Sequence, residues 1–317
     1  MKCLCCNKEL KNGSEYELQT EWHLRCIKTF FGTHDLPEID LSEDALEKLA
    51  NSAVNKGLTV PGVQKKLSLH LDTKDPVSRL TVVDYPTGYI LKPASEHFEF
   101  LPESEHLVMS MASAAGIKTV PGALIRVNDS FAYITKRIDR RDEKKYAMED
   151  FCQLAGRVTA DKYKGSYENC GKIIRKYVNH PGIDSTDFFN RIIFCFLSGN
   201  SDMHYKNFSL IESAPGSRNY MLSAAYDLLP VNIIMPLDTE ETALTLNGKK
   251  KNLHRKDFIA LAKNIGITQN IAANMITRCI SKADLYIRMI EESRLSEEMI
   301  LRFTDLIRER CSRINWD

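Results

Sequence analysis

The stretch N-S-D-M-H-Y-K-N at residues 200–207 places a carboxylate, an imidazole and an amide in one short loop. These groups belong to Asp202, His204 and Asn207, and a further acid, Asp227, follows downstream in the apolar run A-A-Y-D-L-L at 224–229. Phosphoryl transfer requires a protein to orient an acceptor hydroxyl and to hold Mg²⁺ against phosphate oxygens, and Asp and Asn oxygens do both. The pattern therefore predicts phosphoryl-transfer chemistry.

The spacing within this loop assigns a role to each group. The offset from Asp202 to Asn207 equals that of the kinase catalytic loop H-R-D-L-x-x-x-N. We expect Asp202 to accept or orient the acceptor hydroxyl, and Asn207 and Asp227 to hold Mg²⁺. His204 either orders the loop by hydrogen bonding or takes part in proton transfer. The alternative is a polar helix-to-strand turn in which Asp and Asn only satisfy backbone donors, but Asp227 on an apolar, strand-like run argues against it.

Composition indicates an ordinary soluble enzyme. The 317 residues amount to about two domains, and 43 basic against 42 acidic residues leave a net charge of +1, which gives no bulk electrostatic case for nucleic acid or membrane binding. No apolar run approaches the roughly 20 residues of a membrane span, and the N-terminus lacks the apolar region of a signal peptide. Nine cysteines, four of them before residue 27, favour a reducing cytoplasm and a metal site over disulfides.

The pattern of apolar residues predicts an α+β chain with a two-lobed, protein-kinase-like layout. A Cys/His segment occupies residues 1–40, a strand-rich N-terminal lobe residues 41–140, and a helical C-terminal lobe residues 141–317. In the first lobe we expect a helix over 41–55, strands over 66–71, 80–83, 89–92, 123–127 and 131–135, and a helix over 104–115. In the second, buried helix spacing over 188–197 leads into the Asp202 loop, and the last ~65 residues indicate a helical bundle.

A lysine and a glutamate are candidates for phosphate binding. Lys92 ends the strand-like run T-G-Y-I-L-K at 87–92, and Glu105 lies at the start of the next predicted helix, where it can pair with Lys92. The alternatives are a solvated lysine at a strand end and an acid that complements the helix dipole. The loop T-V-P-G-V-Q-K-K at 59–66 contains a single glycine, Gly62, so on its own it also fits a surface turn.

The four cysteine and histidine ligands near the N-terminus have zinc-site spacing. Cys3-x2-Cys6 and His23-x2-Cys26 supply three thiolates and one imidazole, a set that can bind Zn²⁺ tetrahedrally and fasten a segment too small to fold alone. Cys5 is an additional thiol. The alternative is a metal-free core in which nearby aromatic residues provide the packing.

Several of these motifs occur in the order found in a known family. The runs T-V-P-G-V-Q-K-K at 59–66, Y-I-L-K-P at 89–93, Y-I-T-K-R-I-D-R at 133–140, E-D-F-C-Q at 149–153, N-S-D-M-H-Y-K-N at 200–207 and A-Y-D-L-L at 225–229 resemble the HipA family of serine/threonine kinase toxins. The resemblance covers about residues 55–310, and the short Cys/His segment makes the chain similar to a compact form that lacks the additional N-terminal subdomain of longer members.

The resemblance implies a kinase-like two-lobed fold and a role for each motif. Asp202 would be the catalytic base, Asn207 and Asp227 the Mg²⁺ ligands, and Lys92 a ligand of ATP phosphates. The backbone from Lys136 to Ile138 would form the hinge that meets the adenine. The loop at 59–66 would bind phosphate through Val60, Gly62, Val63 and Gln64. Thr59 would take the place of the serine that autophosphorylates in family members.

The resemblance also implies partners. The family's toxins act on aminoacyl-tRNA synthetases and are held by a small helix-turn-helix antitoxin, HipB, which binds operator DNA. This chain would then contact DNA only through the antitoxin, and it would use ATP and Mg²⁺, with Zn²⁺ as a further metal. Two other functions remain open: a small-molecule or lipid phosphotransferase with the same D-x-H-x-x-N loop, and a non-catalytic kinase-fold scaffold in an antitoxin–DNA complex.

Overall fold

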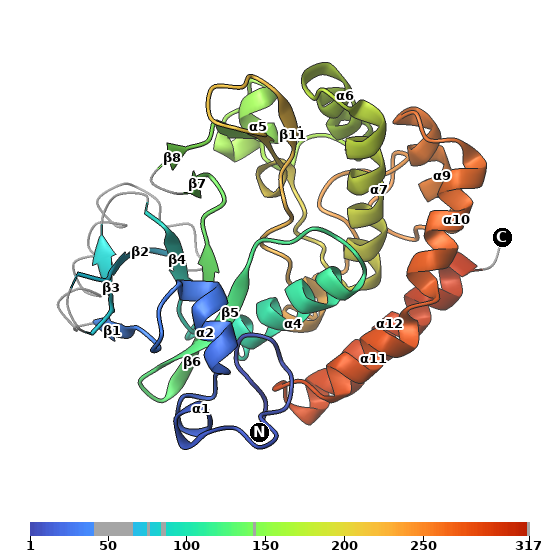
Figure 1. Cartoon of the computed structure of the whole chain (residues 1–317). Helices are drawn as coiled ribbons and strands as arrows, with labels where there is room; N and C mark the ends of the chain where they lie inside the picture. The colour runs from blue at the N-terminus through green and yellow to red at the C-terminus, as the bar shows by residue number, and fades with distance from the viewer. Residues whose placement is uncertain (41–65, 75–76, 84–86, 142–143, 316–317) are drawn as a thin grey trace. The chain divides into compact units, whose positions relative to one another are not determined.

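The chain folds into two compact units (Figure 1). The computed structural model describes residues 1–40, 66–74, 77–83, 87–141 and 144–315. The first unit comprises Met1–His106 with Val120–Arg140, and the second comprises Leu107–Thr119 with Arg141–Asp317. The helix expected over 41–55 lies outside the described residues.

A six-stranded sheet forms the centre of the first unit, with the strand order β1-β3-β2-β4-β6-β5. β1 and β3 run parallel, and the other neighbours are antiparallel. Leu91 lies opposite Leu67 on one side and Ile134 on the other, and all three are buried. The five predicted strands are confirmed with small shifts at their ends, whereas β1 was not predicted. The strands are β1 (Glu38–Asp40), β2 (Leu67–Asp72), β3 (Arg79–Val83), β4 (Tyr89–Lys92), β5 (Gly122–Val127) and β6 (Ser130–Lys136).

Helix α4 (Leu101–Ala114) begins three residues earlier than we expected. Pro102 stands in its first turn, where a missing backbone N–H costs nothing and the fixed φ suits a helix. The helix ends at Ala114, and Gly116, with a φ of +87°, provides the left-handed stop just beyond it. Glu105 therefore lies in the second turn and not at the helix start, so the prediction that it complements the helix dipole as a first-turn acid is wrong.

The Cys/His segment contains two short helices, α1 (Glu15–Thr20) and α2 (Leu24–Phe31). Ser14 and Glu17 form a capping box that starts α1. The ring of Trp22 packs against Phe30 and Phe31, and Phe31 contacts Tyr89 of β4. The segment therefore shares its apolar core with the sheet.

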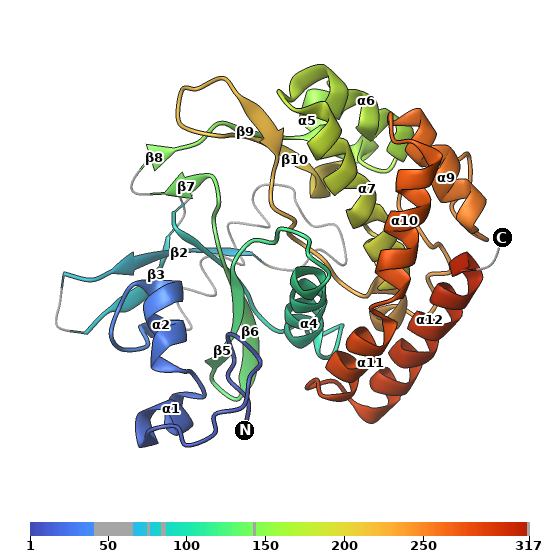
Figure 2. The same cartoon turned by 45° about the vertical axis from the view of Figure 1, so that its right-hand side comes forward.

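The second unit is mostly helical, as the sequence predicts, and α7 (Pro181–Leu197) is at its centre. Figure 2 shows α7 beside α10 and α12, against which it packs. The apolar residues expected at helical spacing from Phe188 to Leu197 are all buried. The predicted C-terminal bundle is confirmed. The remaining helices are α5 (Phe151–Leu154), η1 (Thr159–Asp161), α6 (Tyr167–Tyr177), η2 (Tyr205–Asn207), α8 (Val231–Ile234), α9 (Arg255–Asn264), α10 (Gln269–Ile280), α11 (Ala283–Glu291) and α12 (Glu297–Asn315).

A three-stranded antiparallel sheet, in the order β11-β10-β9, adds to the helices of this unit. Its strands are β9 (Met148–Asp150), β10 (Ser209–Glu212) and β11 (Tyr220–Leu222), and the pair β7 (Arg140–Arg141) and β8 (Lys144–Lys145) precedes them in the chain. Strand β10 follows the Asp202 loop directly, and Phe151 N–H donates to Phe208 O at 2.9 Å. The sheet thus fixes the C-terminal end of that loop.

Among the described residues, no helix is both long enough and apolar enough to cross a membrane.

Candidate active site

The Asp202 loop begins where α7 ends. Gly199 has a φ of +73°, which turns the chain out of the helix, and Asn200 N–H donates to Cys195 O at 2.8 Å. The side-chain oxygen of Asn200 then accepts from Asp202 N–H at 3.2 Å. A buried helix end and a side-chain hydrogen bond therefore set the backbone position of Asp202.

The Asp202 carboxylate is held by a hydrogen bond and is also accessible to solvent. Tyr163 donates its phenolic O–H to Asp202 Oδ1 at 2.6 Å, while nearly half of the Asp202 side chain (45%) stays exposed. The Tyr163 ring in turn lies edge-on to His204, with 5.0 Å between ring centroids. Burial, together with the hydrogen bond to Asp202, raises the pKa of Tyr163, so its proton stays on the phenol at neutral pH. An exposed carboxylate in a fixed orientation is what a base for an acceptor hydroxyl requires.

Asn207 is oriented by a hydrogen bond within the same loop. Its side-chain Nδ2 donates to the backbone carbonyl of Asp202 at 2.9 Å. This donation turns the Oδ1 oxygen, the only atom of the amide that can bind a cation, away from that carbonyl. The contact therefore couples the position of the expected base to that of the expected metal ligand.

Asp227 follows the bridge between Ala225 and Thr119, and the prediction that it lies on a strand-like run is wrong. Its backbone is left-handed, with a φ of +59°, a conformation that Asp tolerates better than most residues. The neighbouring Tyr226 donates through its phenol to Lys206 O at 3.1 Å, and its oxygen lies 2.6 Å from Ser209 Oγ. Tyr226 thereby fixes the segment around Asp227 to the residues next to Asn207.

His204 is a buried part of the loop. Burial lowers its pKa, an effect that the nearby Asp202 carboxylate partly offsets, so the imidazole is neutral at pH 7. Its Nε2 lies 4.0 Å from Asp202 Oδ2, which is longer than a hydrogen bond. The ring packs against Tyr163, which lies outside the loop, and within the described part of the chain its Nδ1 has no hydrogen-bond partner.

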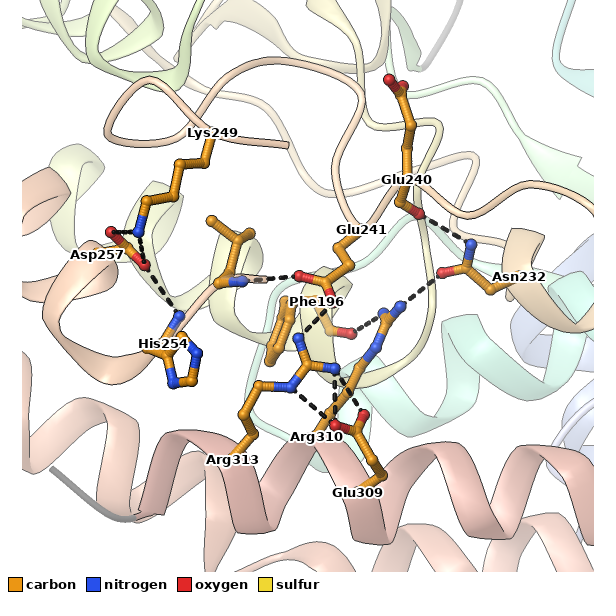
Figure 3. Close-up of polar contacts among 11 residues, drawn as sticks. Phe196, Asn232, Glu240, Glu241, Lys249, His254, Asp257, Glu309, Arg310 and Arg313 are labelled. Atoms are coloured by element: carbon orange, nitrogen blue, oxygen red, sulfur yellow. Dashed lines mark hydrogen bonds and ion pairs between the residues drawn. The ribbon is translucent and has the colours of Figure 1, made fainter. Parts of the chain in front are cut away.

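A network of polar groups connects the loop to α12, and Figure 3 shows its part around Asn232 and Arg310. Ser201 Oγ donates to Asp238 Oδ2 at 2.6 Å, and Asn232 Nδ2 donates to the carbonyls of Asp238 and Glu240, both at 3.0 Å. Arg310 of α12 reaches Asn232 Oδ1 at 2.8 Å and also donates to Phe196 O at the end of α7. The segment after α8 is thus fastened both to the Asp202 loop and to α12.

The same network extends along the chain from residue 238 to residue 257 (Figure 3). Glu241 binds Arg313 of α12 and accepts from Leu253 N–H at 2.9 Å. Asp257 is buried and accepts from Lys249 Nζ at 2.9 Å and from His254 N–H at 3.0 Å. Two buried carboxylates therefore hold this segment, which has little regular structure of its own, against the helices.

Lys92 and Glu105 form a buried ion pair in the first unit. Lys92 Nζ lies 2.5 Å from Glu105 Oε1 and 5.6 Å from the centre of the Tyr133 ring. Both side chains are almost fully buried, so the contact that the sequence predicts is present and the alternative of a solvated lysine is wrong. A buried cation held by a carboxylate has a fixed position, which suits a lysine that must meet phosphate oxygens.

The other predicted nucleotide-binding residues are only partly described. The N–H groups of Lys136 and Arg137 already donate to Pro121 O and Gly88 O. A hydrogen bond to adenine would therefore have to come from the other backbone groups of the segment up to Ile138. The Lys136 ammonium lies over the rings of Phe30 and Tyr89, and burial lowers its pKa. The predicted phosphate loop lies outside the described residues: Thr59, Val60, Gly62, Val63 and Gln64.

The four predicted zinc ligands do come together. Ligand atoms of Cys3, Cys6, His23 and Cys26 all lie within 4.8 Å of one another.

Sequence reasoning missed the residues that hold the loop. Tyr163, Asp238 and Arg310 are separated from Asp202 by tens of residues or more, and each is an ordinary residue type in its local context. Within α12, the signal for Arg310 was its place on the apolar face of the helix, because an arginine there must find buried acceptors.

Comparison with known proteins places the chain among kinases. A family model described as "HipA-like C-terminal domain" matches residues 58–286. A protein of Haemophilus influenzae named "Putative kinase" is 28% identical over 244 residues, which cover 68% of this chain and 69% of that protein. The "Serine/threonine-protein kinase toxin HipA" of Shewanella oneidensis is 22% identical over 243 residues, which cover 70% of this chain and only 54% of that protein.

A solved structure of a HipA protein is similar to this chain in its fold. It is HipA of Shewanella oneidensis in a complex with HipB and operator DNA, and its TM-score to this chain is 0.69 at 20% sequence identity, covering 81% of this chain and 65% of that one. The likeness shows the fold, which is mixed α/β and kinase-like, with a sheet-rich and a helical part as the sequence predicts.

Proposed function

The chain belongs to the HipA family, and from this premise we propose that it is an ATP-dependent serine/threonine protein kinase. The observation that carries the proposal is the hydrogen bond from Asn207 Nδ2 to Asp202 O, which fixes a base and a metal-binding oxygen in one loop. The family relation supports a kinase, and the printed name of the Shewanella relative supports serine/threonine specificity.

Each residue of the loop then has a defined task. Asp202 accepts a hydrogen bond from the acceptor hydroxyl and takes its proton, while Tyr163 holds the carboxylate in place through Oδ1. Asn207 and Asp227 offer the oxygen ligands that Mg²⁺ prefers, so the donor set fits this ion. Mg²⁺, when bound, would neutralise charge on the phosphate oxygens. Lys92, oriented by Glu105, would supply a positive charge for the ATP phosphates.

The family relation supports a toxin role as well. One relative is named a kinase toxin, and the similar structure contains an antitoxin, HipB, and its operator DNA. We therefore propose that this chain is the toxin of such a pair, that it phosphorylates a translation component such as an aminoacyl-tRNA synthetase, and that a HipB-like helix-turn-helix protein brings it to DNA. Autophosphorylation of Thr59 belongs to the same proposal.

One experiment separates the three candidate functions. The wild type, Asp202→Ala and the control Asp305→Asn, an exposed acid of α12, are incubated with Mg²⁺ and labelled ATP, alone and with host lysate, and cell growth is followed in parallel. We expect label in a host protein and growth arrest with the wild type and the control, and neither with Asp202→Ala. Label only in small molecules would replace the protein kinase by a small-molecule or lipid phosphotransferase. ATP binding without any transfer would indicate a scaffold.

A further inference from the structure

The Cys/His cluster near the N-terminus has no part in the kinase chemistry described above. His23 Nδ1 lies 3.4 Å from Cys6 Sγ and 3.9 Å from Cys26 Sγ. The fourth member, Cys3, accepts a hydrogen bond from His23 N–H through its sulfur at 3.4 Å. All nine cysteines are free thiols, so no disulfide accounts for this convergence.

These distances fit a tetrahedral metal site. With Zn–S bonds of about 2.3 Å and Zn–N bonds of about 2.0 Å, neighbouring ligand atoms lie about 3.5–3.8 Å apart. The observed separations of 3.4 and 3.9 Å bracket this range. Three thiols and one imidazole are soft ligands that select zinc over magnesium or calcium. With four protein ligands the coordination is complete, which is typical of structural sites and not of catalytic ones.

Local backbone structure prepares the four ligands. Cys3 and Cys6 lie in a tight turn in which Asn7 N–H donates to Cys3 O at 2.9 Å, with Asn7 in the left-handed region (φ +57°). His23 is the N-cap of α2 and Cys26 lies in its first turn, so one helix start supplies both ligands of the second pair. Each pair is thus held by its own hydrogen-bonded turn.

An apolar core alone does not explain the cluster. Trp22, Phe30 and Phe31 pack together beside it, as the metal-free alternative requires. That packing gives no reason for three thiols and an imidazole nitrogen to point at one another, since aliphatic side chains would fill the same space without a polar atom to satisfy.

The cluster is attached directly to β5, a strand of the same sheet as the Lys92 strand β4, and to α4, which carries Glu105. Leu4 O accepts from Leu124 N–H of β5 at 2.9 Å. Cys5 O accepts from His106 Nε2 of α4 at 3.2 Å, and His106 follows Glu105 in the chain. The turn that holds Cys3 and Cys6 therefore contacts both the sheet and the helix that presents Glu105.

We propose that Cys3, Cys6, His23 and Cys26 bind one Zn²⁺ as a closed structural site, which holds the Cys/His segment against β5 and α4. By bracing α4 next to Glu105, the site also stabilises the Lys92–Glu105 ion pair. This consequence for the ion pair rests on the proposed kinase function, whereas the metal site itself does not.

Metal content tests the site directly. The full chain, expressed without a metal-affinity tag and purified without chelator, should contain about one zinc per chain. After replacement by Co²⁺, it should show the absorption of tetrahedral cobalt with thiolate-to-metal charge transfer. Less than about 0.2 equivalents of zinc, or iron in its place, would overturn the proposal.

Variants test the ligand set. Cys26→Ser should lose the metal, and Cys5→Ser is the matched control, because Cys5 lies in the same turn but outside the group of four. Loss of zinc in the Cys5→Ser protein, or retention in Cys26→Ser, would overturn the assignment. If Cys26→Ser does not fold, the test is made on the wild type. A chelator should lower the midpoint of its thermal unfolding, and one equivalent of Zn²⁺ should restore that midpoint. An unchanged midpoint after complete removal of the metal would contradict a structural role.

Nucleotide binding tests the consequence for the ion pair. Calorimetric titration of the wild type with ATP and Mg²⁺ should show affinity that falls several-fold after zinc removal and returns with zinc. Equal affinity with and without zinc would overturn the link to Glu105. If the zinc-loaded protein does not bind ATP at all, the proposed kinase function fails, while the metal content and the thermal shift still decide the zinc site.

Discussion

At the scale of single residues, the contact between Tyr163 and Asp202 is the feature that most directly bears on catalysis. The phenol occupies one carboxylate oxygen at 2.6 Å, and it is itself positioned by His204 and by the Lys162 ammonium, which lies 4.9 Å from the Tyr163 ring centre. A hydrogen bond to a charged acceptor is short and directional. We infer that Tyr163 is a positioning residue that selects one orientation of the Asp202 carboxylate.

Replacement of Tyr163 by Phe removes only the hydroxyl. We expect kcat to fall about 5- to 30-fold, which corresponds to the roughly 1–2 kcal/mol of a partly exposed hydrogen bond to a charged group, with KM for ATP unchanged. Steady-state kinetics with a protein substrate measures both constants. Tyr177→Phe, at an exposed tyrosine that ends α6, is the control and should behave as the wild type. A kcat equal to or above that of the wild type would show that Tyr163 does not position Asp202.

The residues of the site that could be predicted are those related by local spacing. Asp202 and Asn207 share one loop, and Lys92 and Glu105 lie on a strand and the helix that follows it, so sequence distance translates into contact. Tyr163 comes from a different part of the chain, and its flanking residues K-Y-K give no hint of a buried partner. Its position depends on tertiary packing, which periodicity does not encode.

At the scale of elements, α12 connects several helices of the second unit by packing and by hydrogen bonds. Its Arg310 is buried and donates to the end of α7 and to Asn232, which in turn holds the segment bound to Ser201 (Figure 3). Long helices such as α7 and α12 could be predicted because their apolar residues repeat over several turns. Strands β9, β10 and β11 have only three or four residues each, too few to show alternation.

Replacement of Arg310 by Met keeps the bulk of the side chain but removes its donors. The carbonyl of Phe196 and the amide oxygen of Asn232 would each lose a buried partner, so we expect the free energy of unfolding to fall by about 2–4 kcal/mol in urea denaturation. Arg308→Met, on the exposed face of the same helix, should change it by less than about 1 kcal/mol. Equal losses in both variants would mean that Arg310 contributes as surface charge and not through its buried acceptors.

At the scale of the whole molecule, charge balance limits what the chain binds by itself. The net charge of +1 provides no general attraction for a polyanion, since non-specific DNA binding depends on the release of counterions by many basic groups. If the proposed antitoxin complex forms, this charge balance favours the antitoxin over this chain as the source of its DNA contacts.

We expect the isolated chain to bind duplex DNA no more tightly than the non-specific range of about 10⁻⁴–10⁻⁶ M at physiological salt. Fluorescence anisotropy with a labelled duplex measures this, and the chain mixed with the proposed antitoxin is the positive control. Submicromolar binding by the chain alone, weakened steeply by added salt, would show a basic surface that the net charge conceals.

The claim on which the account depends is that Asp202 is the base of phosphoryl transfer. Its most direct test is the single-turnover rate of transfer to protein at saturating ATP and Mg²⁺, compared between the wild type and Asp202→Asn, with ATP affinity measured on both proteins. The account predicts a rate about 10²- to 10⁴-fold lower in the variant, with ATP affinity retained. A variant rate within about tenfold of the wild type would contradict it.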